Sequence, residues 1–466
     1  MLPGGRRPLS LFADRCKSMA QLKQVHAQMV VTARIQDNYA ASRILSFAAS
    51  GDNADICYAL RLFQATQQPN SFMWNTIIHA LADSPYPSNA LHFTIRMLRQ
   101  SPYSTSPPGR HTFTFALKAC NNCGALSTYE QLHGHVSKRG LQSDLYIING
   151  LIRCYSGGGL LFEARMLFDE MTERNQVVWT TMVSSYAQNL QSNDALSLFH
   201  DMMNQGVEPN DATLASVLSV CARSGCLELG EQIESMVEEK GIERSVILNT
   251  AFVDMYAKNG AIDKAYQLFR QMGEKNIATW NAIICGLALH HGKFALTLFR
   301  ELLQLENGGG SGNGSRKNNP NDVTMVGVLS GCCHAGLVEI GTQIFHSMER
   351  LHGIRPKLEH YSCMVDLFGK TGKLEEAEEL IQSMRWKADV AVLGALLSAC
   401  RKYKNVEIGE RMARRILKLE PCNHGVYVVL SNIYAESGRW DDVLRLRKVM
   451  KGGGLKKIPG WSCEVN

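Results

Sequence analysis

Cysteine is the residue type in this chain with the most obvious capacity for metal binding or redox chemistry, because 14 cysteines occur among 466 residues. Only Cys120 and Cys123 form a Cys-x-x-Cys pair, and no second pair or histidine follows at the spacing of a zinc site. Others, such as Cys154 and Cys221, fall at apolar positions of predicted helices, where a free thiol packs as a small apolar group. The pattern predicts no metal site and no cofactor, and it is typical of a reducing compartment.

Hydroxyl and amide side chains recur at two fixed places of a repeated segment. Thr180 and Thr250 occupy the fifth place of such segments, and Asn210 and Asn276 occupy the last place. Amides and hydroxyls donate and accept hydrogen bonds, which aliphatic side chains cannot do, so these two places could contact a polar ligand. Asparagine is also favoured at helix ends, so helix capping is the competing explanation for the last place.

Three tryptophans set the long period of the sequence. Trp74, Trp179 and Trp280 each open a short apolar, helix-like run, and they are 105 and 101 residues apart. Cys120 and Cys221 are again separated by 101 residues. A period of this length in a chain of this size predicts an array of repeats rather than a single globular core.

Each long period divides into three unequal units, and each unit is an expected helical hairpin. Unit starts at Leu145, Gln176, Asp211 and Val246 give lengths of 31, 35 and 35 residues. Within a unit the apolar residues recur every three or four positions, as in amphipathic helices, and a turn rich in Gly or Asn separates the two helices. A lone hairpin cannot bury its apolar stripe, so the hairpins must stack, and the long face of the stack is the expected functional surface.

Composition and charge limit the classes of function. Hydrophobic residues make up 45% of the chain, which suffices for a continuous core between hairpins. No apolar run approaches the ~20 residues of a membrane span, so we expect no membrane partner. A net charge of +6 permits a nucleic acid partner but does not require one. Residues 1–20 contain basic side chains and Asp14 as their only acid, a weak sign of an organellar targeting segment. Residues 306–321 are rich in Gly, Ser and Asn, which is typical of a flexible insertion.

The unit lengths and several short phrases resemble a known family. Units of 31, 35 and 35 residues, Trp-Asn or Trp-Thr starts and the phrases LKAC, VDMYAKNG and LFDEM are similar to plant pentatricopeptide repeat proteins of the PLS subgroup, from about Gln21 onward. Tetratricopeptide repeats, the nearest confusable class, hold a steady period of ~34 residues. The resemblance implies an all-α fold, a right-handed solenoid superhelix of stacked helix-turn-helix repeats. It divides the chain into an array of about ten L, S and P units over 21–389, E1 and E2 motifs over 390–457 and a tail over 458–466.

The C-terminal part of the sequence sharpens the resemblance. Phrases that begin at His360, Gly394 and Tyr427 look like the last S repeat and the E1 and E2 motifs of the family. Family members with this tail are typically site-recognition factors for C-to-U editing of organellar transcripts. A zinc cytidine deaminase needs a His-x-Glu motif and a Pro-Cys-x-x-Cys pair, and neither occurs, since Pro421-Cys422 has no second cysteine at that spacing. The protein is therefore expected not to be an enzyme, and to recruit a DYW-type deaminase and other editing-complex proteins in trans.

The resemblance also implies which side chains read RNA. In this family the fifth and last residues of a unit recognise one base, with Thr or Ser at the fifth place favouring purines, Asn favouring pyrimidines, and the last residue choosing within each class. The implied pairs are Ser42 with Asn70 (adenine), Asn75 with Gly109 (a weakened pyrimidine bias), Thr114 with Asp144 (guanine), Asn149 with Asn175 (a pyrimidine), Thr180 with Asn210 (adenine), Thr250 with Asn276 (adenine), Asn281 with Asn321 (a pyrimidine) and Ser362 with Asp389 (guanine). Ala215 with Ser245, and Val326 with Lys357, break the pattern and are expected to read poorly.

The second place of a unit is mostly apolar. The residues there are Tyr39, Phe72, Tyr146, Val177, Ile247 and Ala278. Such side chains could sandwich the flat faces of successive bases, and stacking on an aromatic ring contributes roughly 1 to 3 kcal/mol per base. Packing at the start of the helix is the alternative explanation.

The leading functional hypothesis is a sequence-specific, single-stranded-RNA-binding recognition factor for C-to-U editing in the mitochondrion, or alternatively the chloroplast. A second hypothesis keeps RNA binding but assigns a role in organellar RNA splicing, stabilisation or translation. A third makes the array a protein–protein interaction scaffold. The polar bias at the fifth place argues against a scaffold, and the E1 and E2 resemblance favours editing over the second hypothesis.

Overall fold

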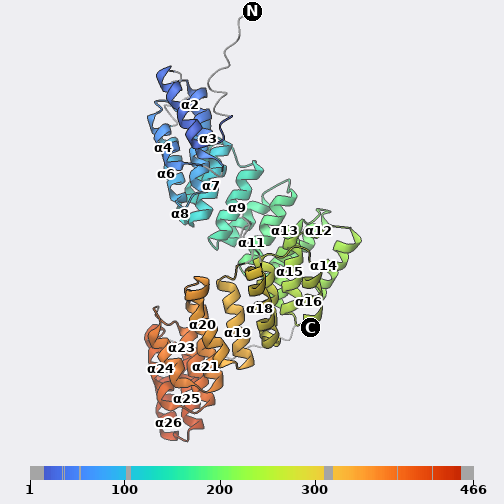
Figure 1. The fold of residues 1–466 in the computed structure, drawn as a ribbon, viewed down its shortest axis with the longest axis vertical. Coiled ribbons are helices and arrows are strands. Elements are labelled where there is room, and N and C mark those ends of the chain that lie inside the picture. Colours follow the sequence, from blue (N-terminus) through green and yellow to red (C-terminus); the bar gives the residue numbers. More distant parts are fainter. Residues whose placement is uncertain are drawn as a thin grey trace, which may run out of the picture. The chain divides into compact units, whose positions relative to one another are not determined.

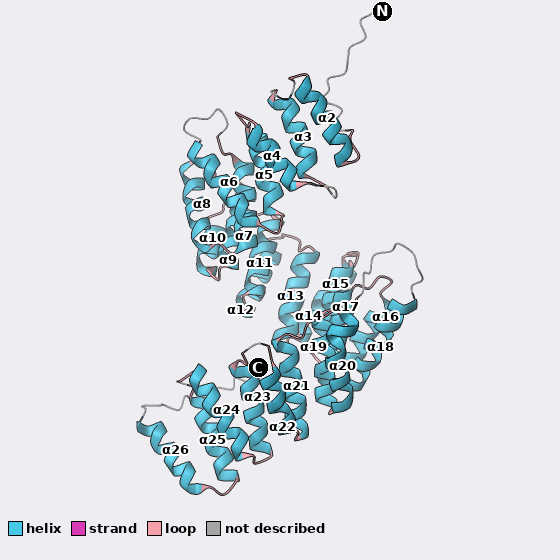
Figure 2. Cartoon of the chain, turned by 60° about the vertical axis from the view of Figure 1, so that its left-hand side comes forward, coloured by secondary structure: helices cyan, strands magenta, loops and turns pink. Residues whose placement is uncertain are grey.

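The computed structural model of the protein describes residues 15–33, 35, 37–51, 54–100, 107–308, 319–385, 387–421 and 423–452. These residues are mostly α-helical, and no β-strand occurs among them (Figure 2). The expected targeting segment 1–20 and insertion 306–321 lie partly outside the described residues, and the expected tail 458–466 lies wholly outside them. Within the described part, no helix combines the length and apolar character needed to cross a bilayer.

The helices alternate as first and second members of hairpins, after an initial α2 (Met19–Val31) (Figure 1). The first helices are α3 (Asn38–Ala49), α5 (Ser71–Ala82), α7 (Arg110–Cys123), α9 (Leu145–Gly157), α11 (Gln176–Gln188), α13 (Asp211–Ser224), α15 (Val246–Lys258), α17 (Ile277–His290), α19 (Asp322–Ala335), α21 (Leu358–Thr371), α23 (Val390–Lys402) and α25 (His424–Glu436). The second helices are α4 (Ile56–Ala65), α6 (Pro87–Gln100), α8 (Leu126–Lys138), α10 (Leu161–Asp169), α12 (Ser192–Asn204), α14 (Leu227–Glu239), α16 (Ile262–Gln271), α18 (Gly292–Gly308), α20 (Val338–His352), α22 (Leu374–Ser383), α24 (Val406–Leu419) and α26 (Trp440–Gly452). The prediction of an all-α fold of helix-turn-helix repeats is confirmed.

The chain forms two compact units, residues 1–220 and 221–466, which are described separately. In each unit the first helices pack side by side, as α5, α7, α9 and α11 do in the first unit and α15, α17, α19, α21 and α23 do in the second. Most first helices also pack against the second helix of their own hairpin and against that of the hairpin before. The first helices therefore form one continuous layer within each unit.

The tryptophans that mark the long period join successive hairpins. The edge-to-face pairs are Phe63 with Trp74, Phe168 with Trp179 and Phe269 with Trp280, with ring centroids 4.7, 4.9 and 4.8 Å apart. In each pair the phenylalanine lies near the end of a second helix, and the tryptophan lies in the first turn of the next first helix. Aromatic pairs of this kind contribute about 0.5 to 1.5 kcal/mol beyond the burial of their surface. The repeated Phe and Trp of the sequence are thus two halves of one contact that fixes how hairpins stack.

A buried carboxylate joins two hairpins of the second unit. Glu234 on α14 accepts a hydrogen bond from the Tyr256 hydroxyl on α15 at 2.6 Å. The same carboxylate lies 2.9 Å from Lys264 Nζ and 3.1 Å from Arg244 Nη1, and only 8% of Glu234 is exposed. Burial by itself would raise the pKa of Glu234, but the three donors bring this pKa below its ordinary value. Burial and the neighbouring Glu234 carboxylate raise the pKa of Tyr256 to about 12.

We predict that Glu234→Gln lowers the free energy of unfolding at neutral pH by about 2 to 3 kcal/mol, because it weakens three charge-assisted hydrogen bonds in a buried place. The lowered pKa of Glu234 means that its contribution is present above the pKa of an unfolded glutamate and is lost as pH falls through the folded pKa. The difference between variant and wild type should therefore shrink in acid. Urea unfolding followed by circular dichroism across a pH series measures both effects.

Glu231→Gln is the matched control, because the Glu231 carboxylate lies 3.5 Å from the same Lys264 Nζ but is half exposed. We expect it to change the unfolding free energy by less than about 0.5 kcal/mol. Equal effects of the two substitutions would contradict a stabilising role specific to the buried carboxylate.

Candidate nucleic-acid interface

The last residue of most predicted units caps the first helix of the next unit, although Gly109 and Lys357 make no side-chain cap. The side-chain oxygen of the capping residue accepts the backbone N–H of the third residue of that helix at 2.9 to 3.2 Å. The capping residues are Asn70, Asp144, Asn175, Asn210, Asn276, Asn321 and Asp389. Helix capping is therefore a real role of these side chains. It also fixes which atom of each side chain faces the helix, because only an oxygen can accept the N–H.

We call each junction between units a slot. A slot consists of the fifth residue of one unit, the last residue of that unit and the third residue of the next unit, and it is named after the fifth residue. In four slots the third residue is a threonine whose hydroxyl meets the fifth-place side chain. The contacts are Thr112 to Asn75 at 2.7 Å, Thr213 to Thr180 at 2.7 Å, Thr279 to Thr250 at 2.7 Å and Thr324 to Asn281 at 2.6 Å. We call these joined slots.

The last-place amide completes three of the joined slots. The third-place hydroxyl lies 3.0 to 3.1 Å from the capping oxygen of Asn210, Asn276 or Asn321. Asn281 Nδ2 also donates directly to Asn321 Oδ1 at 3.0 Å. The Asn75 slot lacks this element, because its last residue is Gly109, whose backbone N–H donates to Thr112 Oγ1 at 3.2 Å. The structure thus brings together fifth- and last-place residues that are far apart in sequence, directly in the case of Thr180 with Asn210 and of Asn281 with Asn321.

The other four predicted fifth-place residues are not joined in this way. Ser42 is 6% exposed, and its hydroxyl donates to the Tyr39 carbonyl within its own helix at 2.7 Å. Thr114 donates to the Arg110 carbonyl of its own helix at 2.9 Å. Asn149 Oδ1 is buried and has no hydrogen-bond partner within the described residues. Ser362 likewise makes no side-chain hydrogen bond in that part of the chain.

A hollow in the first unit gathers several of the predicted residues. It has a volume of about 380 Å³, and its lining includes Asn149, Val177, Thr180 and Asn210. The lining is otherwise rich in small polar side chains and contains the basic Arg153. A surface of this kind offers hydrogen-bond donors and acceptors beside one cation, which suits a polar, anionic ligand.

The second-place residues point away from the core. Exposed fractions are 52% for Tyr39, 53% for Phe72, 66% for Tyr146, 52% for Val177 and 64% for Ile247. Their third-place neighbours are buried instead, so the alternative that second-place residues pack at the helix start is wrong. The Arg110 guanidinium lies over the Tyr146 ring, 5.5 Å from its centroid. These side chains are therefore accessible to a ligand rather than part of the core.

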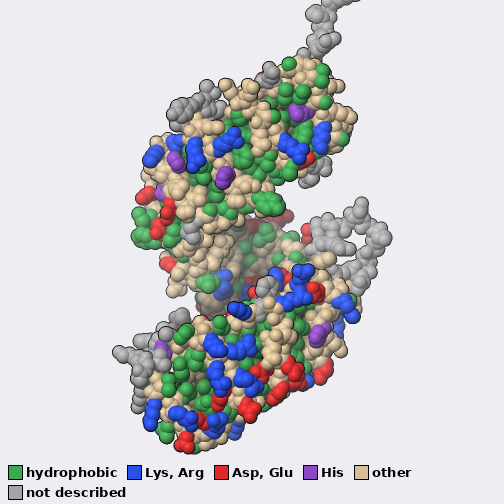
Figure 3. Space-filling view, turned by 90° about the vertical axis from the view of Figure 1, so that its left-hand side faces the viewer, with side chains coloured by type: hydrophobic (Ala, Val, Ile, Leu, Met, Phe, Trp, Pro, Cys, Tyr) green, Lys and Arg blue, Asp and Glu red, His purple; other side chains and the backbone are tan. Residues whose placement is uncertain are grey.

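A set of basic residues at the thirteenth place of several units was missed by reasoning from sequence. The residues are Arg223, Lys258, Lys370 and Lys402. Lys258 and Lys370 each pair with an aspartate one turn earlier, at 2.8 Å. Lys and Arg side chains also spread over the lower part of the face shown in Figure 3, with acidic side chains toward its edge. The recurrence of a basic residue eight positions after the fifth place was the available signal.

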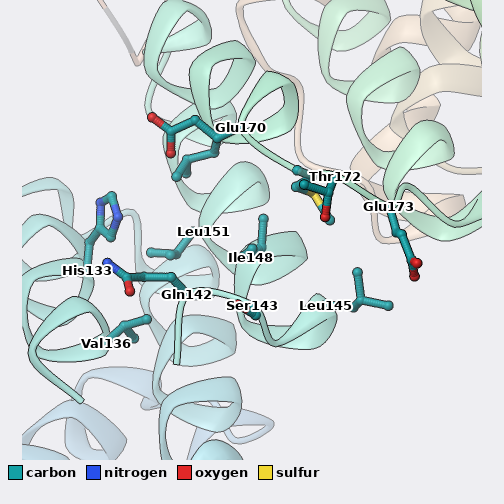
Figure 4. A pocket seen from close by; sticks show the side chains of 12 residues that line it. His133, Val136, Gln142, Ser143, Leu145, Ile148, Leu151, Glu170, Thr172 and Glu173 are labelled. Atoms are coloured by element: carbon teal, nitrogen blue, oxygen red, sulfur yellow. The ribbon is translucent and has the colours of Figure 1, made fainter. Parts of the chain in front are cut away.

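A separate cavity between α8, α9 and α10 contains none of the predicted residues. Its volume is about 570 Å³, and Figure 4 shows His133, Leu151, Glu170 and Glu173 on its lining. The carboxylates of Glu170 and Glu173 lie on opposite sides of the view, so they do not form a carboxylate pair. Burial lowers the pKa of His133, and Glu170 opposes that shift in part. In the described residues no group of His, Cys, Asp and Glu is arranged to hold a metal ion.

Comparison with known proteins gives matches along the array. The model described as E motif matches residues 403–464, the PPR repeat family model matches 174–223, and the PPR repeat model matches 146–176, 250–277, 323–352 and 359–387. Pentatricopeptide repeat-containing protein At5g56310 of Arabidopsis thaliana is 38% identical over 96% of this chain and 88% of its own length. Pentatricopeptide repeat-containing protein CRR2, chloroplastic, of the same plant is 35% identical over 97% of this chain and 67% of its own length. The crystal structure of the pentatricopeptide repeat protein PPR10 from maize shares the fold, with a TM-score of 0.55 at 17% identity, and covers 97% of this chain and 74% of that one.

Stacked hairpins with a polar slot at successive junctions define a helical-repeat protein. The chain belongs to the plant pentatricopeptide repeat family, as a PLS-type member with an E motif.

The helix cap made by the last-place residues leads to a stability prediction. Asn210→Ala removes the acceptor of the Thr213 N–H and should lower the free energy of unfolding by about 1 kcal/mol. Asn210→Asp keeps a capping oxygen and adds a favourable charge at the helix N-terminus, so its unfolding free energy should stay within about 0.5 kcal/mol of wild type. Chemical unfolding of the two variants tests this. Equal losses would show that the cap seen here does not stabilise the helix.

Proposed function

We propose that the protein binds single-stranded RNA in a sequence-specific manner and acts as a site-recognition factor for C-to-U editing of organellar transcripts. The observation that carries the proposal is the set of joined slots. The fifth-place side chain meets the last-place amide directly in the Thr180 and Asn281 slots, and the third-place hydroxyl connects the two in the Thr250 slot. Repeat proteins of this kind read one base per repeat with two or three side chains. A peptide-binding scaffold would have no need for this regular polar pairing.

The helix cap supplies a physical reason why the last residue distinguishes bases. Asn210 Oδ1 is occupied by the Thr213 N–H at 2.9 Å, so the amide nitrogen remains to offer N–H donors to a ligand. On the Watson–Crick edge, adenine N1 and cytosine N3 accept hydrogen bonds, whereas guanine N1 and uracil N3 carry protons. A capping asparagine therefore favours adenine or cytosine.

A capping aspartate reverses this preference. Asp389 keeps Oδ1 for the Val392 N–H at 2.9 Å and retains a second oxygen that can only accept. That oxygen suits the N–H of guanine or uracil. Combined with the fifth-place preference implied by the family, the slots specify adenine, any, guanine, pyrimidine, adenine, any, adenine, pyrimidine, any, guanine from the 5′ end. The cap argument narrows the pyrimidines at the Asn149 and Asn281 slots to cytosine.

Two further rows of side chains fit the same ligand. Exposed rings such as Tyr39 and Tyr146 offer faces on which bases can stack. The thirteenth-place cations, such as Lys258 and Lys402, stand two turns beyond the fifth place on the same helices, where they can neutralise backbone phosphates. Neither row distinguishes one base from another. The two rows therefore contribute to the affinity for RNA, and the slots determine which base sequence is preferred.

The proposed editing role rests on the E motif at residues 403–464. In this family, proteins with such a motif are typically editing factors. Residues 1–466 hold no His-x-Glu and no Pro-Cys-x-x-Cys arrangement. We propose that a DYW-type deaminase, which joins the complex in trans with other editing proteins, carries out the deamination. We propose the mitochondrion as the site of action, with the chloroplast, named for the relative CRR2, as the alternative.

Substitutions in the Thr180 slot should recode one nucleotide. Asn210→Asp should shift the preference opposite this slot from adenine to guanine by roughly tenfold, because one donor becomes an acceptor. Thr180→Asn combined with Asn210→Asp should shift it to uracil. Fluorescence anisotropy with four RNAs that differ only at this nucleotide measures the profile. The preference opposite the Thr250 slot should stay unchanged, and an unaltered profile opposite Thr180 would refute the assigned register.

Loss of the protein in a plant should leave one or a few cytidines unedited in organellar transcripts, a few nucleotides 3′ of the predicted element. Transcriptome sequencing of both organelles from a null line measures this and identifies the compartment. Normal editing throughout, together with a splicing or transcript-abundance defect, would contradict the editing role while leaving RNA binding intact.

A further inference from the structure

The third-place residue divides the slots into two kinds. It is Thr112, Thr213, Thr279 or Thr324 in the joined slots, and Met73, Ile147, Val178 or Val392 in the slots of Ser42, Thr114, Asn149 and Ser362. We propose that the third-place threonine is a positioning residue, which fixes the orientation of the fifth-place and last-place side chains and so sharpens the base selectivity of its slot. This inference rests on the proposed function, since it concerns how the same slots select a base.

The third-place hydroxyl does more than fill space at the helix start. In Thr112, Thr279 and Thr324 it accepts the backbone N–H of the residue before the helix, as in a capping box, and it also contacts the fifth-place side chain. Thr112, Thr213, Thr279 and Thr324 are all 0% exposed. Valine has the same shape and fills the same place in the Asn149 slot, where Val178 is 1% exposed and its N–H still donates to the cap at 3.1 Å. A buried hydroxyl is costly unless it is hydrogen-bonded. Each of these hydroxyls meets that requirement by bonding to the fifth-place side chain.

The Asn281 slot shows what the hydroxyl does. Thr324 Oγ1 donates to Asn281 Oδ1 at 2.6 Å, which turns the nitrogen of this amide toward Asn321 Oδ1, 3.0 Å away. Asn321 Oδ1 in turn accepts the Thr324 N–H at 3.1 Å. Both amides therefore have a single orientation, and each retains an N–H to offer to a base.

The Asn149 slot is a matched pair to the Asn281 slot within the same chain. Both have Asn at the fifth place and Asn at the last place, and they differ at the third place, where Val178 replaces threonine. Asn149 Oδ1 is buried and has no partner among the described residues. No hydrogen bond to Asn149 Oδ1 fixes the orientation of this amide group. An amide that can turn over presents either a donor or an acceptor to the base, so this slot should discriminate less.

The test uses the full-length chain and synthetic RNAs that carry the predicted element, with each of the four bases in turn opposite the Asn281 slot or the Asn149 slot. In wild type, the affinity ratio of cytosine to the other bases should be about five- to tenfold larger at the Asn281 slot than at the Asn149 slot. Thr324→Val should reduce the ratio at the Asn281 slot to that of the Asn149 slot. Thr324→Ser, which restores the hydroxyl, should keep the wild-type ratio.

Val178→Thr supplies the converse experiment, because it offers the missing hydroxyl to Asn149 and should raise selectivity at that slot alone. A ratio of affinities is measured at one nucleotide, so general loss of stability, which lowers binding to all RNAs together, does not change it. If wild type is selective at the Asn281 slot and Thr324→Val leaves that selectivity intact, the positioning role is refuted and the proposed function stands. If wild type shows no base preference at any slot, the proposed sequence-specific RNA binding is itself refuted, and the positioning role is refuted with it.

Discussion

The unpaired N–H groups at the start of each first helix are the constraint on which both the fold and the interface depend. A helix N-terminus must find acceptors for these groups, and short polar side chains just before the helix are the usual solution. Seven residues that the family implies as readers of RNA accept such an N–H at 2.9 to 3.2 Å, and Ser245, which is expected to read poorly, does the same at 3.2 Å. The cap occupies one side-chain oxygen, so a capping asparagine offers N–H donors to a ligand and a capping aspartate offers an acceptor oxygen. Capping and recognition are therefore consequences of one interaction rather than competing explanations.

Slot geometry also depends on how closely the first helices stack. Gly286 on α17 shows the limit, because a Cβ at this position would lie 2.2 Å from the Cβ of Ala257 on α15. The same two helices carry the Thr250 slot, in which the Thr250 and Thr279 hydroxyls are 2.7 Å apart. The close approach that the missing Cβ permits brings these short side chains within hydrogen-bonding distance. Aromatic pairs such as Phe269 with Trp280 hold the hairpins in this arrangement from the other side of the layer.

Sequence reasoning identified what depends on local signals. Capping residues and amphipathic periods lie within one helix, so the first helices begin where the sequence places the units, as α11 does at Gln176 and α17 at Ile277. The role of the third place could not be seen, because the partners of Thr279 and Thr324 lie 29 and 43 residues away and depend on helix stacking. Ser42 has the expected type and place and donates to its own backbone, as Thr180 and Thr250 also do, but the third place of its slot is Met73, which offers no hydroxyl.

The shared cap makes some changes of specificity easier than others. Exchange of Asn for Asp at a last place preserves the capping oxygen, so a slot can pass between the adenine or cytosine class and the guanine or uracil class without loss of the helix end. A change at the fifth place must also suit the third-place residue. Thr180→Asn is tolerable because Asn281 already faces a threonine in the same arrangement. If the fifth residue were aliphatic, the buried hydroxyl of a third-place threonine would lose its fifth-place hydrogen-bond partner, which is unfavourable for a buried polar group. Joined slots should therefore hold polar fifth residues, whereas slots with an aliphatic third residue are free to lose them, as Ala215 ahead of Leu248 illustrates.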